Sequence, residues 1–367
     1  MNKICIYFLL LAIAVTITAQ EENNPGTFSS AFAIARKNYG PNAVFMWKGK
    51  KYTTQLKEEL QRDRLLNKES FIDKLILEDS LYILHTNNTN GALENCYCPD
   101  HPLGSLEKRV VFVKEFLEKH PNTILVDVGD FTTFSHDGFK DSLVMEAYNL
   151  MPYDAILPGD QELAMDTKKI NELLLKSRAP IIGTNLVMPG LDNLIPHLIV
   201  NRAGLRVAIL GIINDHILKF YPEEIRNRIK LSDPIKAVRL KMNQLKDKAD
   251  VFILLTHQGT DLDQDLAMAI DSLDIIVGGH SQSVIHEPRE VNGSLVVQAG
   301  KDGYYVGIVQ LNFNNGKILS KTGKLESMLL SMPNDSRVLS MIKEYEKILK
   351  SKKELFKFIV DELTKIK

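Results

Sequence analysis

The sequence predicts an α/β domain built on central β-sheets, and two observations favour this fold class. Between Leu81 and Phe313, short apolar runs of strand length alternate with stretches in which apolar residues recur at helical spacing. Five of the apolar runs are followed by polar residues of types that bind metal ions. Because open α/β sheets bind ligands at the carboxyl ends of their strands, we expect these five ends to converge on one site.

The five runs are LYILHTNNTNG, TILVDVGD, YDAILPGDQE, VFILLTHQG and LDIIVGGHSQ. Their polar residues are carboxylates, imidazoles and amides, namely Asn88, Asn90, Asp127, Asp130, Asp160, Gln161, His257, His280 and Gln282. We expect Asp127 to support the DVGD turn rather than bind a ligand directly. His85 lies inside the first run, and we expect it to hydrogen-bond the backbone. The sequence therefore predicts a cluster of oxygen and nitrogen donors.

Residues 21–80 precede this domain, and their pattern predicts a small appendage with a linker. AFAIARKNYG predicts a short helix that ends at Gly40, and VFMWKGKKYTT predicts a hairpin around a Lys-Gly turn. The charged stretch that follows predicts a helical connector. Trp47, the only tryptophan, is interpreted as a packing residue.

The domain itself is predicted over residues 81–324. In SLEKRVVFVKEFLEKHPN, four apolar residues fall on one face of a helix that stops before Pro121, namely Leu106, Val110, Val113 and Leu117. Residues 325–367 predict a tail of one or two amphipathic helices.

The first 20 residues have the pattern of a secretory signal peptide. Lys3 precedes the apolar core ICIYFLLLAIAV, and small residues follow it. We therefore expect an exported protein, periplasmic or extracellular, with no membrane span once the signal is cleaved. The formal net charge of -1 gives no reason to expect nucleic acid as a partner. The sequence does not indicate a protein partner.

The chain has three cysteines, and Cys5 belongs to the predicted signal. Cys96 and Cys98 lie in NCYCPD, close in sequence to the first polar block. In an oxidising compartment such a pair forms a loop disulfide or binds a soft metal, and the sequence leaves both alternatives open.

The order and spacing of the five blocks resemble those of the calcineurin-like metallophosphoesterases, in particular the N-terminal catalytic domain of bacterial 5′-nucleotidases. In that family the blocks are roughly HTND-x-HG, D-x-GD, GNH-[ED], H-x-G and GH-x-H. The flanking YDA, IIGTNL and VVQAGKDGYYVG match as well. The resemblance implies a four-layer αββα sandwich with two mixed β-sheets. It also implies a site for two divalent metals that share one carboxylate.

One of the two metal positions is degenerate in this sequence. The resemblance assigns it Asn88, Asn90, Asp130 and Gln282, of which three carry amides where the family has a carboxylate or an imidazole. Neutral amide oxygens bind transition metals weakly and supply no compensating charge. We therefore expect this position to hold no metal.

The other metal position keeps residues that coordinate metals. The resemblance assigns it Asp130, Asp160, His257 and His280, with Asp160 standing where the family has Asn. The extra negative charge favours a cation, so we expect one divalent metal, Mn, Zn or Fe, whose identity stays open. The alternative is that His257 and His280 are satisfied core histidines.

The catalytic histidine of the third block is Gln161 here. An amide donates a hydrogen bond but does not act as a general acid near neutral pH. The resemblance thus implies slow hydrolysis of phosphate esters of small molecules, with Asn88 and Gln161 donating hydrogen bonds to phosphoryl oxygens. Two alternatives remain: an inactive family member that binds a metal, a phosphorylated ligand or a partner protein, and a thiol-dependent role for Cys96 and Cys98.

Overall fold

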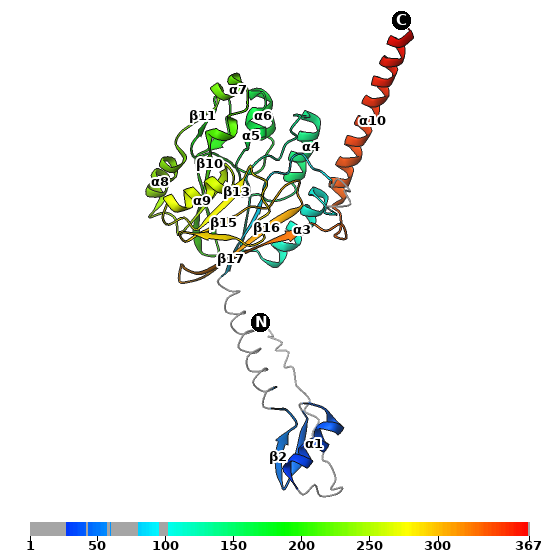
Figure 1. Cartoon of the computed structure of the whole chain (residues 1–367), viewed down its shortest axis with the longest axis vertical. Coiled ribbons are helices and arrows are strands. Elements are labelled where there is room, and N and C mark those ends of the chain that lie inside the picture. Colours follow the sequence, from blue (N-terminus) through cyan, green and yellow to red (C-terminus); the bar gives the residue numbers. More distant parts are fainter. Residues whose placement is uncertain (1–26, 42, 57–58, 60–79, 95–101, 366–367) are drawn as a thin grey trace, which may run out of the picture. The chain divides into compact units, whose positions relative to one another are not determined.

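The structure, a computed structural model, describes residues 27–41, 43–56, 59, 80–94 and 102–365. The chain divides into two compact units, Met1–Glu78 and Asp79–Lys367 (Figure 1). The predicted signal peptide, most of the charged connector, and Cys96 and Cys98 lie outside the described residues. The predictions that concern those segments therefore stay predictions.

The N-terminal unit contains the predicted short helix and hairpin. Helix α1 (Phe28–Tyr39) begins with Thr27 accepting a hydrogen bond from the Ser30 amide, and it ends at Gly40 in the left-handed region (φ 77°). Strands β1 (Val44–Trp47) and β2 (Lys50–Thr53) pair antiparallel across the Lys-Gly turn. Both predictions are confirmed. Packing between α1 and the hairpin is aromatic and involves Phe28, Phe32, Phe45, Trp47 and Tyr52.

The second unit contains two mixed β-sheets. The seven-stranded sheet has the order β17-β16-β3-β4-β5-β6-β8, and the six-stranded sheet has the order β14-β15-β13-β12-β10-β9. The first comprises β3 (Ser80–Thr86), β4 (Thr123–Asp127), β5 (Ala155–Ile156), β6 (Ile181–Ile182), β8 (Leu194–Ile195), β16 (Tyr305–Asn314) and β17 (Lys317–Ser327). The second comprises β9 (Leu198–Arg202), β10 (Leu205–Ile213), β12 (Val251–His257), β13 (Ile275–Gly279), β14 (Arg289–Val291) and β15 (Ser294–Val297). Two short strands, β7 (Leu186–Val187) and β11 (Lys230–Leu231), pair separately.

The helices are α3 (Leu106–Lys119), α4 (Gly138–Tyr148), α5 (Asp160–Ala164), α6 (Thr167–Leu174), α7 (Glu223–Arg228), α8 (Pro234–Leu245), α9 (Thr260–Ala269) and α10 (Ser336–Lys365), with a 3-10 helix η1 (Asp215–Leu218). The predicted helix after the first block is confirmed, since α3 buries Leu106, Val110 and Val113 and ends before Pro121. In the tail, α10 packs against α3 and α4. Within the described part of the chain, no helix combines the length and the apolar character of a membrane span.

Alternating residues of β10 and β12 explain why these strands are apolar on both faces. Val207 and Ile253 belong to the large apolar cluster that also contains residues of the seven-stranded sheet. Their neighbours Ala208 and Phe252 belong to a second cluster, together with residues of α8 and α9. A sheet buried on both faces has continuous apolar strands rather than alternating ones. The predicted sandwich of two mixed sheets with helices is confirmed (Figure 1).

The expectation for His85 is wrong. Its side chain is buried and its Nδ1 has no hydrogen-bond partner in the described structure. Burial lowers the pKa of His85 to about 3, so the ring is neutral. The imidazole packs over Gly307 of β16, the residue opposite it in the ladder. A Cβ at position 307 would lie 1.8 Å from His85 Nε2, so only glycine leaves room for this ring.

The contact between His85 and Gly307 gives a stability prediction. Gly307→Ala should lower the free energy of unfolding by about 3 kcal/mol, because the added methyl group overpacks the sheet. Urea denaturation checks this value. Gly138→Ala is the matched control, since a Cβ there meets nothing within 4 Å, and it should change stability by less than about 1 kcal/mol. Equal effects of the two substitutions would contradict the packing argument.

Candidate metal centre

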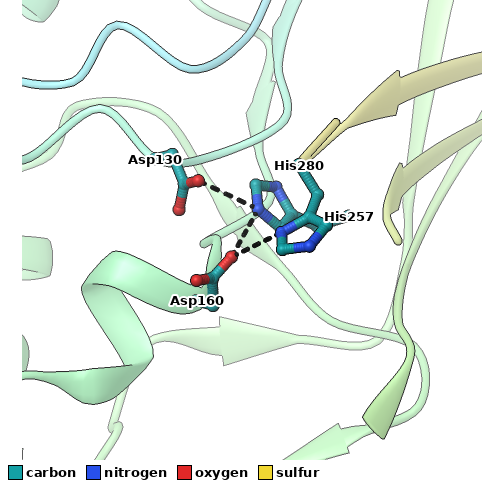
Figure 2. Close-up of side chains that lie close together, drawn as sticks. All are labelled: Asp130, Asp160, His257 and His280. Carbon is teal, nitrogen blue, oxygen red and sulfur yellow. Dashed lines mark hydrogen bonds and ion pairs between the residues drawn. The ribbon is translucent and has the colours of Figure 1, made fainter. Parts of the chain in front are cut away.

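The carboxyl ends of parallel strands from both sheets bring four side chains together. Asp130 follows β4, Asp160 begins α5 after β5, His257 ends β12 and His280 follows β13. One ligand atom from each of the four lies within 4.8 Å of all the others. The four side chains point toward one another (Figure 2). The two carboxylates and His257 are buried and His280 is half-buried. The predicted convergence of these strand ends is therefore present in the structure.

Hydrogen bonds fix the orientation of both imidazoles. His257 Nδ1 lies 2.6 Å from the Val128 carbonyl oxygen, which leaves Nε2 at 3.2 Å from Asp130 Oδ2 and 3.0 Å from Asp160 Oδ1. His280 Nδ1 lies 2.9 Å from the same Asp160 oxygen (Figure 2). A histidine that donates one N–H to a carbonyl presents its other nitrogen in a fixed tautomer, as metal-binding histidines do.

Burial and charge act against each other at this cluster. Burial alone would raise the pKa of Asp160, but hydrogen bonds from His257 and His280 outweigh it and hold that pKa well below its usual range. Burial alone would lower the pKa of His257, and the carboxylates of Asp130 and Asp160 raise it well above its usual value. The pocket between these groups thus strongly favours positive charge.

The donor set fits a divalent cation. Two carboxylates and two imidazoles are the oxygen and nitrogen donors that suit Zn, Mn or Fe. A metal that holds such ligands at about 2.1 Å needs donor atoms separated by at most about 4.2 Å. The 4.8 Å span is close to that limit, so small side-chain rotations would complete the coordination.

Glu162, which the sequence analysis missed, holds the loops after β4 and β5 together. Its buried carboxylate accepts hydrogen bonds from the amides of Asp130, Gly159 and Thr132 and from the Thr132 hydroxyl, at 2.8–2.9 Å. Gly159 permits this close approach, because a Cβ there would lie 2.4 Å from Asp130 Oδ1. Glu162 is the last residue of the third block, at the acidic position of the family pattern, but no role was predicted for it.

Tyr221 was also missed, since it lies in a loop without metal-ligand spacing. Its hydroxyl donates a 2.7 Å hydrogen bond to Asp160 Oδ2, the oxygen that faces away from the imidazoles. Burial and the Asp160 charge raise the pKa of Tyr221, so the phenol stays protonated as a donor. Tyr221 therefore positions Asp160.

Asn88 occupies the degenerate metal position as a hydrogen-bond donor. Its Nδ2 lies 2.8 Å from Asp130 Oδ2, the oxygen that also faces His257. Its Oδ1 accepts hydrogen bonds from the Asn87 side chain and from the His280 amide. The amide thus satisfies the Asp130 carboxylate with an N–H group instead of a cation.

Asn90 of the degenerate position and Gln161 of the third block form a chain of hydrogen bonds that ends at Asp302. Gln161 Nε2 donates to Asn90 Oδ1 at 2.9 Å, and Asn90 Nδ2 donates to Asp302 Oδ1 at 2.8 Å. Asp302 was not predicted, because its segment VVQAGKDGYYVG was used only as a flank that matches the family. The Gln282 side chain joins none of the hydrogen bonds in the described part of the chain. Asn88 and Gln161 remain candidate donors to a ligand, each with one amide hydrogen unassigned.

Asp127 supports the turn as predicted. Its Oδ1 accepts a 2.9 Å hydrogen bond from the Gly129 amide, and its Oδ2 accepts from Thr86 and Tyr148. Burial raises the pKa of Asp127 to about 6. This residue lies behind the cluster and does not belong to it.

No protein-family model matches the sequence. The metallophosphoesterase YunD of Bacillus subtilis, whose function is uncharacterised, is 23% identical over 266 residues, which cover 69% of this chain and 54% of that protein. The human 5′-nucleotidase is 26% identical over 300 residues, which cover 72% of this chain and 52% of that protein. The chain therefore spans about half the length of these curated relatives.

Two solved structures have a similar fold. A 5′-nucleotidase precursor from Thermus thermophilus gives a TM-score of 0.67 at 21% identity, covering 74% of this chain and 59% of that one. The calcineurin-like phosphoesterase YfkN from Bacillus subtilis gives 0.62 at 19% identity, covering 73% of this chain and 97% of that one. This chain is a relative of the metallophosphoesterases and 5′-nucleotidases. The two sheets and their helices in the unit Asp79–Lys367 thus have the fold that the resemblance implied.

The buried carboxyl group of Asp263 predicts that the stability of the fold depends on pH. It lies buried on α9, where Gln258 Nε2 donates a 2.9 Å hydrogen bond to its Oδ1. Burial raises its pKa from 3.8 to about 7. The folded chain therefore keeps a proton that the unfolded chain loses, so this contribution to stability is complete below pH 3.8 and is lost as the pH rises to about 7.

Asp263→Asn should remove this contribution to the pH dependence. At pH 8 the variant should be more stable than the wild type by up to about 4 kcal/mol, and the difference should shrink towards pH 4. Urea denaturation across this pH range measures the effect. Asp265→Asn, at an exposed position of the same helix, is the control and should leave the pH profile unchanged. If the stability of all three proteins changed with pH in the same way, Asp263 would not have a raised pKa in the folded chain.

Proposed function

We propose that the chain is a 5′-nucleotidase-like metallophosphoesterase that hydrolyses phosphate esters slowly with one divalent metal. The observation that carries this proposal is the unequal state of the two halves of the site. Asp130, Asp160, His257 and His280 bring four donor atoms within 4.8 Å, whereas Asn88 fills the neighbouring half with an amide hydrogen bond. The relatives support phosphoester hydrolysis as the reaction class.

The four residues would hold the metal, and the remaining residues would act on the substrate. A divalent cation at such a site supplies Lewis-acid activation of water and neutralises phosphoryl charge. Asn88 and Gln161 each have an amide hydrogen for a phosphoryl oxygen. Neither donates a proton to the leaving group, and an absent general acid costs about 10²–10⁴-fold in rate. The predicted activity is therefore slow.

Elemental analysis of the purified protein, paired with turnover of an aryl phosphate, tests this proposal. We expect one metal per chain, and we expect His257→Ala to lower both metal content and turnover by at least about tenfold, because it removes a ligand. His286→Ala, at an exposed histidine of the loop before β14, is the control and should change neither. Two metals per chain, or none at Mn²⁺ or Zn²⁺ saturation, would refute the proposal.

The amide chain favours a second candidate function, in which the domain binds a metal or a phosphorylated ligand without catalysis. Gln161, Asn90 and Asp302 are hydrogen-bonded to one another where the family has an imidazole acid and a metal ligand. A network of two amides and a carboxylate offers hydrogen bonds to a ligand, and the buried Gln161 Oε1 has no partner among the described residues, but neither amide contributes acid chemistry. A partner protein and export through the signal peptide remain proposals from the sequence.

Asn88→Asp distinguishes the two functions. Without metal, this substitution removes the 2.8 Å hydrogen bond from Asn88 to Asp130 and places two carboxylates next to each other. It should lower the free energy of unfolding by about 2–3 kcal/mol. Excess Mn²⁺ should restore the stability and raise the metal content above one per chain. Increased turnover under these conditions supports the slow enzyme, and unchanged turnover supports the binding protein. Asn227→Asp, at an exposed position of α7, is the control.

Two results would contradict the role of Asn88 itself. The first is that the metal-free variant is as stable as the wild type in urea. The second is that Mn²⁺ fails to stabilise the variant beyond its effect on the wild type.

A further inference from the structure

A cavity of about 480 Å³ lies beside the metal centre, bounded by η1, α7 and β11. Its floor is apolar and is made by Leu218, Ile229 and Leu231. Of these, Leu218 and Ile229 are buried, so the floor is part of the fixed packing of the domain. Four charged or polar side chains complete the lining, namely Asp215, His216, Lys219 and Arg226, and all four are exposed.

The cavity adjoins the metal centre through His216. The His216 ring meets the His280 ring edge-on, with 5.9 Å between their centroids. Its Nδ1 lies 3.1 Å from Asn214 Oδ1, which orients the ring. Tyr221, from the same loop, donates its hydroxyl to Asp160. His216 therefore both lines the cavity and contacts a residue of the metal centre.

The rim carries more positive than negative charge. Among the described residues, neither Lys219 nor Arg226 forms an ion pair, and Asp215 is the one acidic residue in the lining. Lys219 Nζ lies 5.7 Å from the centre of the Phe220 ring, and Phe220 is 91% exposed. Phe220 follows Lys219 in the chain and does not itself line the cavity.

We propose that this cavity binds the organic part of a phosphorylated ligand that carries a second negative charge. The apolar floor covers the body of the ligand, and Lys219 and Arg226 bind its second acidic group. The phosphoryl end lies toward His280, and this orientation rests on the proposed function. The charge preference of the cavity depends only on the residues of its own rim, so it persists without metal.

The test compares two probes, phenyl phosphate and 4-carboxyphenyl phosphate, which differ only in the second charge. Their dissociation constants are measured by ligand-observed NMR on the full chain, with Mn²⁺ and with EDTA. The phosphate group contributes equally to both constants, so their ratio reports the contribution of the second charge to binding in the cavity. Lys219→Gln, Arg226→Gln and the double variant remove the cations, and Lys236→Gln, an exposed lysine of α8 outside the cavity, is the control.

We expect the wild type and Lys236→Gln to prefer the carboxylated probe by about tenfold, each single variant to lose about threefold, and the double variant to lose the preference. A wild-type ratio near one, a ratio unchanged in the double variant, or no saturable binding of either probe would overturn the proposal. Failure of the proposed function has a different signature, because a protein without metal would still keep the charge preference in EDTA.

Discussion

The Asp130 carboxylate is the contact on which the rest of the site depends. It accepts hydrogen bonds from the Asn88 side chain and from the backbone N–H of Gln161, and it faces the His257 ring. These partners follow or end three other strands, so one buried group joins loops from both sheets. A buried carboxylate is tolerated only when its oxygens are satisfied, and here two amide N–H groups and an imidazole satisfy them. Loss of that carboxylate would leave several loops without a common partner.

The backbone of the loops around Asp130 adopts strained conformations. Five residues of the site have positive φ, and they are Asn88 at 47°, Asn90 at 53°, Asp130 at 54°, His280 at 71° and Gln282 at 55°. Asparagine tolerates the left-handed region, whereas such a conformation costs other residues about 1 kcal/mol or more each. The surrounding hydrogen bonds, including those of Glu162, offset this cost. The loops therefore hold side chains in positions that unstrained turns would not give them.

The sequence predicted the parts of this structure that follow from periodicity and strand ends. The two sheets, α3 and the meeting of Asp130 with His257 all follow from apolar runs that end in polar residues. Glu162 and Tyr221 escaped prediction because they hydrogen-bond the aspartates of the cluster and do not belong to the cluster themselves. Glu162 lies at the acidic position of the third block, but that pattern does not reveal its hydrogen bonds, and nothing in the spacing of Tyr221 marks it. His85 was misjudged because the glycine opposite it in the ladder, 222 positions along the chain, makes its space. Long-range complementarity of this kind has no local signal.

The distribution of carboxylates explains why one half of the site is a network of amides and the other half has metal-binding oxygen and nitrogen atoms. Relative to the family pattern, Asn88 removes a carboxylate beside Asp130 and Asp160 adds one on the opposite side. The number of carboxylates is unchanged, but the negative charge now lies with the two imidazoles. A cation is bound where charge concentrates, and a neutral amide pairs with a carboxylate where the charge has been removed. The two substitutions act as one change, because an aspartate at position 88 would place a third carboxylate beside Asp130 and Asp160.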